Sequence, residues 1–188
     1  MTTRTVAILH LFTVHIGWFG CILGAAYGYP MAGPVLVALL LVLSLKVMDD
    51  APGRLRLTAI LTAIGTFVDS AITLGGYMAF DSPASVGENS GGIVLVPLWM
   101  IALWVNFSTA VRPLLGFLRG RVWLAVPLGA FGGAMAYRGG AVLGALTLPG
   151  GYASLLVIGV EWAILLPLAV WLDARSRGVG TQGMVLEE

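Results

Sequence analysis

The sequence predicts an all-α integral membrane protein, a six-transmembrane-helix bundle, and three observations support this. Six apolar runs follow one another, each close to the ~20 residues that cross a bilayer as a helix. Only 10% of the 188 residues are charged, whereas a soluble domain carries charge on about a quarter of its positions. Turn-forming residues separate the runs, and Lys and Arg gather in alternate breaks.

The helices are expected over residues 6–27, 31–48, 55–78, 93–115, 122–143 and 153–172. Each break carries turn chemistry: Gly28 to Pro30, Asp49 to Gly53, Asp81 to Gly92, Arg119 to Arg121 and Leu148 to Gly151. A cleavable signal peptide is the alternative for the first run, but its apolar stretch is longer than a typical signal core. Residues 1–177 are expected to form one transmembrane domain, and the short polar tail 178–188 to be disordered.

The positions of the basic residues predict that both termini lie in the cytoplasm. With the N-terminus inside, the inner segments hold nine of the ten basic residues: Arg4, Lys46, Arg54, Arg56, Arg112, Arg119, Arg121, Arg175 and Arg177. Only Arg138 falls near an outer loop. The longest outer loop carries Asp81 and Glu88 without a base.

Composition also excludes several classes of function. A net charge of +1 argues against a nucleic-acid partner, because such proteins carry a concentrated basic patch. The single cysteine, Cys21, has no partner for a disulfide or a cysteine-based metal cage. His15 with Asp69 and Glu161 would be a metal trio, but no metal-binding spacing supports it, so neither metal nor cofactor is expected.

Two acids lie where hydrocarbon is expected. Asp69 falls near the middle of the third run and Glu161 near the middle of the sixth. A charged acid at the bilayer centre costs roughly 2.5–3.5 kcal/mol on insertion scales, and such residues usually face the bundle interior and serve function. The alternative is a neutral acid that is hydrogen-bonded to a neighbour. Both are therefore candidates for ligand or proton binding.

Asp69 belongs to a polar stripe along the third run. Threonines and the acid recur at spacings of three and four, and Ser70 flanks them: Thr58, Thr62, Thr66, Asp69 and Thr73. Threonine hydroxyls can bond to carbonyls of the preceding turn, so each alone means little. The whole stripe indicates a wet or ligand-bearing face.

Other polar and aromatic residues are expected at a similar depth: His15, Trp18, Trp104, Asn106 and Trp162. Tryptophan normally favours the membrane interface, so three near the midplane indicate a buried role in which each indole N–H needs an acceptor. An aromatic cavity with two acids would suit an amine or a polar headgroup. Bulky filling of the bundle is the alternative.

Two patterns concern packing. Small residues recur at a four-residue pitch in the first and fifth runs, which favours close helix contacts or a homodimer. In addition, the segment from Val68 to Ile72 matches that from Val160 to Ile164, each in the third helix of its half. This match leads to the hypothesis of a 3+3 inverted repeat with a site at the midplane.

Several motifs resemble a known family. They are Gly33-Pro34, Asp69-Ser70, Pro97-Leu98-Trp99 with Leu103-Trp104 and Phe107, then Gly132-Gly133, Tyr137 and Gly144-Ala145. Over about residues 17–172 the chain resembles the bacterial domain-of-unknown-function family 2878 (DUF2878), small multi-helix inner-membrane proteins. The resemblance implies a bacterial inner-membrane location and makes Tyr137 a further candidate site residue. Members are often encoded beside enzymes that modify membrane fatty acids, which points to lipid but transfers no catalytic residue.

Three hypotheses follow, with transport placed first. A small transporter or flippase for a lipid or a cationic amphipathic molecule would place Asp69 and Glu161 on one pocket. An intramembrane lipid-modifying enzyme would bring His15, Ser70 and Asp69 together in a cleft. A non-catalytic partner of a lipid-modifying enzyme would have satisfied acids and no cavity. Membrane lipid, a second copy of the chain or such an enzyme are the expected partners.

Overall fold

The structure, a computed structural model, describes residues 3–47, 50–80 and 96–183. Within these ranges the chain forms six α-helices and one short 3-10 helix. They are α1 (Thr3–Ala26), α2 (Ala32–Val47), α3 (Ala51–Leu74), α4 (Leu98–Leu114), η1 (Gly116–Leu118), α5 (Val122–Val142) and α6 (Tyr152–Gly183). The predicted all-α class and the order of six helices are confirmed. The acidic loop around Glu88 lies outside the described residues.

The third and fourth helices begin and end at other residues than predicted. α3 starts at Ala51 rather than at residue 55, because the Asp50 side chain accepts a hydrogen bond from the Gly53 N–H and a proline stands in the first turn. It ends at Leu74, before the left-handed Gly76 (φ 75°). α4 starts at Leu98, after Pro97. Residues 93–95, where its start was predicted, lie outside the described ranges.

α6 is longer than predicted. It continues through Gly183, so 178–183, which the sequence assigned to a disordered tail, are helical. Extending an existing helix adds one hydrogen bond per residue without a new nucleation step, so the helix runs on past the apolar stretch. Residues 184–188 lie outside the part of the chain that the structure describes.

Three helices of the described chain are long and apolar enough to cross a membrane, over Ile8–Ala26, Ala51–Leu74 and Tyr152–Ser176. A fourth apolar stretch, Ala32–Lys46, is shorter. Large apolar side chains also point outward from the bundle, and Phe67 is 75% exposed. An outward apolar surface of this kind fits hydrocarbon, and the chain is therefore a multi-pass membrane protein.

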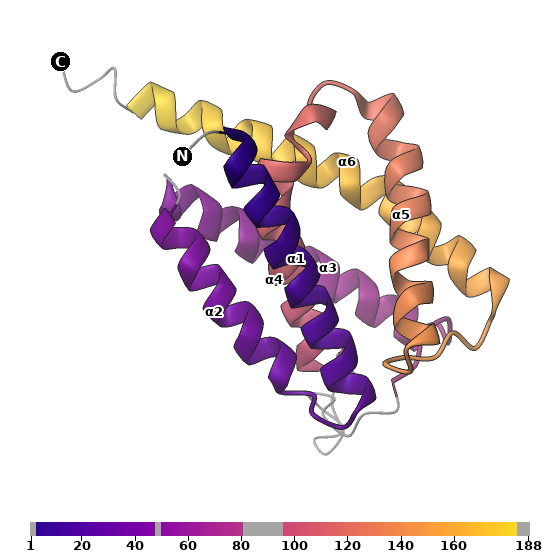
Figure 1. Cartoon of the computed structure of the whole chain (residues 1–188). Helices are drawn as coiled ribbons and strands as arrows, with labels where there is room; N and C mark the ends of the chain where they lie inside the picture. Colours follow the sequence, from indigo (N-terminus) through magenta and orange to yellow (C-terminus); the bar gives the residue numbers. More distant parts are fainter. Residues whose placement is uncertain (1–2, 48–49, 81–95, 184–188) are drawn as a thin grey trace.

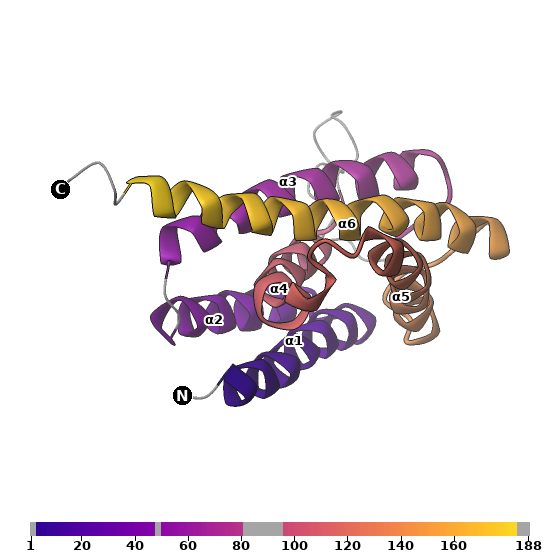
Figure 2. The ribbon, with the colours of Figure 1, turned by 90° about the horizontal axis from the view of Figure 1, so that it is seen from above.

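α4 is the central helix of the bundle. It packs against α1, α2, α3 and α6, and Figure 2 shows it end-on between the α1–α2 pair and α6. α3 and α6 run side by side in both views, and α5 packs along α6 (Figure 1). This arrangement turns one face of each of α3, α4, α5 and α6 toward a common interior.

The connections between the helices lie at two opposite ends of the bundle. Both termini, the α2–α3 junction and the α4–α5 connection lie at one end in Figure 1, and the α1–α2 and α5–α6 connections lie at the other. At this second end, backbone hydrogen bonds of 3.0 and 2.8 Å join Ala79 to Thr147. The segments predicted to be cytoplasmic therefore share one end.

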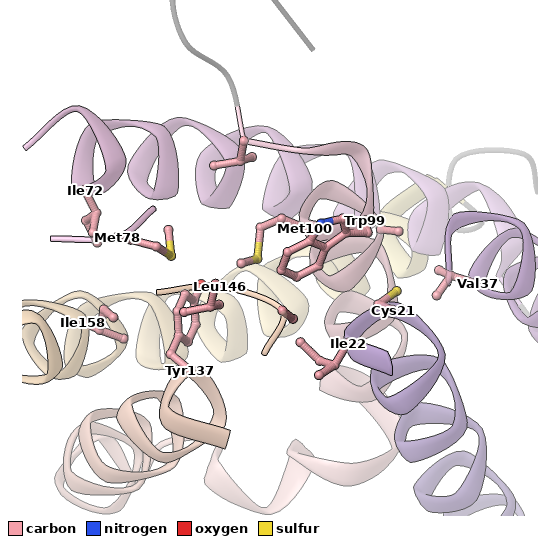
Figure 3. Packing of buried hydrophobic residues seen from close by; sticks show 13 residues of the cluster. Cys21, Ile22, Val37, Ile72, Met78, Trp99, Met100, Tyr137, Leu146 and Ile158 are labelled. Atoms are coloured by element: carbon pink, nitrogen blue, oxygen red, sulfur yellow. The ribbon is translucent and has the colours of Figure 1, made fainter. Parts of the chain in front are cut away.

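The largest apolar cluster draws on all six α-helices (Figure 3). Its labelled members are Cys21, Ile22, Val37, Ile72, Met78, Trp99, Met100, Tyr137, Leu146 and Ile158. Trp99 and Ile158 are fully buried. The cluster holds the C-terminal ends of α1, α3 and α5 around the start of α4.

The helix contacts do not display the symmetry of an inverted repeat. α5 packs along much of α6, whereas the corresponding pair of the first half, α2 and α3, touch at few positions. α3 and α6, the last helices of the two halves, do pack against each other.

Candidate functional site

Asp69 lies in the interior of the bundle and is fully buried. The Tyr137 hydroxyl donates a hydrogen bond of 2.7 Å to its Oδ1, and the Trp104 indole N–H donates one of 2.6 Å to its Oδ2. Both carboxylate oxygens are therefore hydrogen-bonded, one from α5 and one from α4. Buried hydrogen bonds to a carboxylate are among the stronger ones in proteins, so Asp69 ties three helices together.

Glu161 of α6 lies in the same cluster. It is 6% exposed and has Coulombic interactions with Asp69 and Tyr137. Unlike Asp69, neither of its oxygens has a hydrogen-bond partner among the described residues. A buried polar group without a partner is costly. The structure thus brings the two predicted acids together, one satisfied and the other without a donor.

Stacked aromatic rings stand beside the acids. Trp104 of α4 and Trp162 of α6 lie nearly parallel, with ring centroids 5.0 Å apart and an interplanar angle of 7°. Phe107 packs edge-on against both rings, at 5.7 and 4.9 Å. The stack needs two glycines, because a Cβ on Gly65 would collide with Trp104 and one on Gly133 with Trp162.

These rings line a cavity of about 240 Å³ between α1, α4, α5 and α6. Its lining is mainly apolar and includes five aromatic residues: Trp18, Trp104, Phe107, Tyr137 and Trp162. Asn106 is the one amide side chain among the described lining residues, and its Nδ2 donates a 2.8 Å hydrogen bond to the Val14 carbonyl of α1. Neither acid belongs to the lining, so both lie behind the aromatic wall.

The cavity lies where α1 and α5 diverge. Near their C-terminal ends the helices approach each other, and a Cβ on Gly140 would lie 3.2 Å from Ile22. Toward their N-terminal ends they separate (Figure 1). Gly132, which lines the cavity, is exposed, and a Cβ there would meet nothing within 4 Å. The cavity therefore opens sideways, toward the surface where lipid would lie.

The remaining candidates lie elsewhere. His15 is exposed, and its Nδ1 is 2.7 Å from the Leu11 carbonyl oxygen within α1. The Ser70 hydroxyl donates to the Thr66 carbonyl within α3, at 2.6 Å. The expected convergence of His15, Ser70 and Asp69 is therefore absent, because His15 projects from the outer face of α1.

The polar stripe of α3 is not a wet face. The Ser108 hydroxyl donates to that of Thr58 at 2.8 Å, and Thr73 donates to the Asp69 carbonyl. The hydroxyl oxygens of Thr62 and Thr66 are buried without a partner among the described residues. No described residue of α3 lines the cavity. The stripe packs against neighbouring helices instead, and only Asp69 joins the site.

Sequence reasoning missed a second set of interior charges. Arg112 of α4 contacts Asp173 of α6 at 2.7 Å and Asp50 at 2.9 Å, and Arg119 contacts Asp173 at 2.9 Å. Asp173 is only 1% exposed. Arg112 and Arg119 were treated as markers of orientation and Asp50 as part of a turn, and no role was assigned to Asp173. Asp173 directly follows an apolar run, and this position could have marked it as a buried charge. Its partners, Arg112 and Arg119, are distant in sequence and could not be identified in this way.

Metal binding has no support in the geometry of the described chain, where no three His, Cys, Asp or Glu side chains are grouped as ligands. A family model described as "Protein of unknown function (DUF2878)" matches residues 7–168. No curated protein and no solved structure matches the chain.

Proposed function

The chain belongs to the DUF2878 family, and we propose that it is a small flippase-like transporter of an amphipathic molecule with an apolar body and a cationic group. It is proposed to cross the bacterial inner membrane six times, with both termini in the cytoplasm. The distribution of Lys and Arg favours this orientation.

The observation that carries the proposal is the pairing of buried acids with an aromatic cavity that opens sideways. Aromatic rings such as those that line the cavity attract a cation, and the Asp69 carboxylate behind Trp104 and Tyr137 adds negative charge. The apolar lining suits a hydrocarbon body. At about 240 Å³ the cavity is below the ~300–1,000 Å³ of usual ligand sites, so it fits a headgroup or one chain segment.

Asp69 offers a way to couple a proton to the cavity. As a carboxylate it accepts one hydrogen bond at each oxygen, and both donors are cavity walls. A proton on Oδ2 makes that oxygen a weaker acceptor, so the hydrogen bond from the Trp104 N–H, which can only donate, becomes weaker. The indole can then turn more easily, which changes the shape of the ligand site.

Glu161 makes this exchange more favourable. Two carboxylates in one buried cluster repel each other when both are charged, so a proton or a cationic ligand is attracted there. Because the pair can bind either, a proton can be exchanged for the ligand's positive charge. This is the coupling that a proton-driven transporter needs.

The transport hypothesis placed both acids on the pocket itself, whereas neither lines it, so the acids are proposed to act through its walls. The other two hypotheses have less support. The enzyme hypothesis required His15 and Ser70 beside Asp69, and these three are not assembled. The accessory-partner hypothesis required satisfied acids and no cavity, whereas a cavity is present and Glu161 lacks a donor among the described residues.

Uptake into proteoliposomes tests the proposal. An alkyltrimethylammonium probe should accumulate faster than in empty vesicles when a pH gradient is imposed. Asp69→Asn and Glu161→Gln should reduce the rate to that of empty vesicles, because each removes a proton-binding group. Asp50→Asn changes an acid at the charged end of the bundle and should retain uptake.

Binding can be measured separately through tryptophan fluorescence. A brominated alkyltrimethylammonium should quench wild-type emission more strongly than a brominated alcohol of equal length, since only the cation gains from the rings and acids. Asp69→Asn should reduce the difference between the two quenchers, because one acid is removed while the rings and Glu161 remain. Uptake and quenching that are unchanged in Asp69→Asn would disprove the proposed role of the acid.

A further inference from the structure

A second cavity lies at the charged end of the bundle. It has a volume of about 370 Å³ and lies between the first turns of α3 and the C-terminal part of α6. Arg56 and Arg175 line it together with the apolar side chains of Leu57, Ile60 and Leu172. It shares no lining residue with the aromatic cavity.

Both arginines are exposed, and neither forms an ion pair within the described chain. The guanidinium of Arg175 lies over the ring of Trp171, 4.1 Å from its centroid. This cation–π contact holds the guanidinium in place while its N–H groups can donate to a ligand. Among the described residues, the cavity therefore has two positive groups that no acidic side chain pairs with.

The one carboxylate among the described lining residues is already paired. Asp50 accepts a hydrogen bond from Arg112 at Oδ2 and one from the Gly53 N–H at Oδ1. The hydrogen bond from Arg112 lowers the pKa of Asp50, which keeps this acid ionised and paired at neutral pH. Its charge is thus balanced by Arg112, and Arg56 and Arg175 leave the cavity electropositive.

The apolar side of the cavity indicates where the rest of a ligand would lie. Leu57 and Ile60 follow Arg56 on α3, which is long and apolar enough to span the bilayer. Trp171 is 48% exposed at the same level of α6, as expected of an indole at the membrane interface. A charged rim beside an apolar wall at this depth matches a phospholipid, whose phosphate lies at the interface and whose chains enter the hydrocarbon.

We propose that this cavity binds the phosphate of an anionic phospholipid. Arg56 and Arg175 hold the phosphate, for which the planar guanidinium fork is well shaped, and the acyl chains lie against α3 and α6. Basic pockets between transmembrane helices on the cytoplasmic side are known to bind anionic headgroups. The inference uses the predicted orientation and is independent of the transport proposal.

Thermal unfolding in neutral detergent micelles tests the site. Phosphatidylglycerol should raise the Tm of the full-length protein more than phosphatidylcholine does. In the double variant Arg56→Gln/Arg175→Gln this difference should disappear, and titrations should give affinity that is weaker by about fivefold for each arginine removed. Arg121→Gln removes an exposed arginine at the same end but outside the cavity, so it should behave as the wild type.

Two further measurements distinguish a lipid site from a site for a free anion, and a binding defect from a folding defect. Inorganic phosphate and glycerol phosphate should shift the Tm less than the lipid does. An equal shift would identify a site for a free anion and overturn the lipid assignment. If the double variant does not fold, Arg56→Lys/Arg175→Lys keeps the charge, loses the fork and should bind more weakly. Equal affinity of the wild type and either double variant for phosphatidylglycerol would overturn the proposal.

Discussion

Adjacent glycines in α5 have opposite surroundings, although the sequence makes them look equivalent. Gly133 faces the ring of Trp162, and a Cβ there would collide with it. Gly132 faces the open mouth of the aromatic cavity. The stack of Trp104 on Trp162 thus depends on the absence of one particular Cβ.

We expect Gly133→Ala to destabilise the protein by about 1–3 kcal/mol, because the added methyl group overpacks the core and forces Trp162 to move. Gly132→Ala is the matched control and should leave the stability unchanged or raise it by up to about 1 kcal/mol, because its Cβ meets nothing and alanine favours a helix. Unfolding in detergent measures the energy, and near-ultraviolet circular dichroism reports the indole stack. Equal effects of the two substitutions would contradict the assignment of Gly133 as the contact.

The acids of the site could be predicted from the sequence, but their partners could not. Asp69 and Glu161 stand out because charge in an apolar run is costly wherever the helix packs. Which donors reach Asp69 depends on how α3, α4 and α5 pack, and Trp104 and Tyr137 lie 35 and 68 positions away. The side of α1 that carries His15 was equally undetermined, because that helix is apolar nearly all round.

At the scale of elements, an ion-pair network holds the charged end of the bundle together. Arg112 at the end of α4 bridges Asp173 of α6 and Asp50 at the start of α3. Asp173 is buried and also contacts Arg119, whereas the Asp50 side chain is 48% exposed. The bridge to Asp50 is therefore the one most open to solvent.

Acid should weaken this junction. The hydrogen bond from Arg112 lowers the folded-state pKa of Asp50 below its ordinary value. At a pH above the pKa that Asp50 has in the unfolded chain, its lowered pKa in the folded protein stabilises the fold. This contribution disappears as the pH falls through the pKa of the folded state. We expect Asp50→Asn to lose less stability than the wild type when unfolding is compared at pH 5 and pH 3. The difference should be small, within about 1 kcal/mol, because exposed pairs are screened by water. A larger acid loss in the variant would contradict the assigned bridge.

The ends of α5 were predicted best, because two glycines with positive φ, Gly120 and Gly144, flank this helix. α5 begins at Val122 and ends at Val142, one residue from its predicted end. α3 begins four residues earlier than predicted, because Asp50 and Pro52 were assigned to a turn rather than to a helix start. α6 continues past its apolar part because the end of an apolar run limits membrane burial and does not by itself break a helix.

For the whole molecule, local pattern predicted the number and order of helices, while packing decided the site. The runs and their flanking charges are local features, so each can be identified without knowing its neighbours. The central position of α4 and the divergence of α1 from α5 come from contacts between distant segments. The aromatic cavity arises from that divergence, and for this reason no local sequence motif predicts it.

The proposed six crossings give a definite labelling pattern. α2, α4 and α5 are the helices at issue, because none of them is among the three that length and composition single out as spans. The ends of α2 and α5 offer exposed residues that can be labelled. Tyr29 and Tyr152 are exposed at one end of the bundle, and Lys46 and Arg121 are exposed at the other. Each of these two helices is therefore flanked by one exposed residue at either end.

We expect single Tyr29→Cys and Tyr152→Cys variants to react with an impermeant maleimide added to intact spheroplasts. Lys46→Cys and Arg121→Cys should react only after permeabilisation. The wild type serves as the blank, because its single cysteine, Cys21, is fully buried. If Lys46→Cys and Tyr29→Cys are both labelled from outside, α2 does not cross the membrane. If Arg121→Cys and Tyr152→Cys are both labelled from outside, α5 does not cross it. A fully reversed pattern would keep six crossings, invert the protein, and place the Arg56 and Arg175 cavity on the outer face.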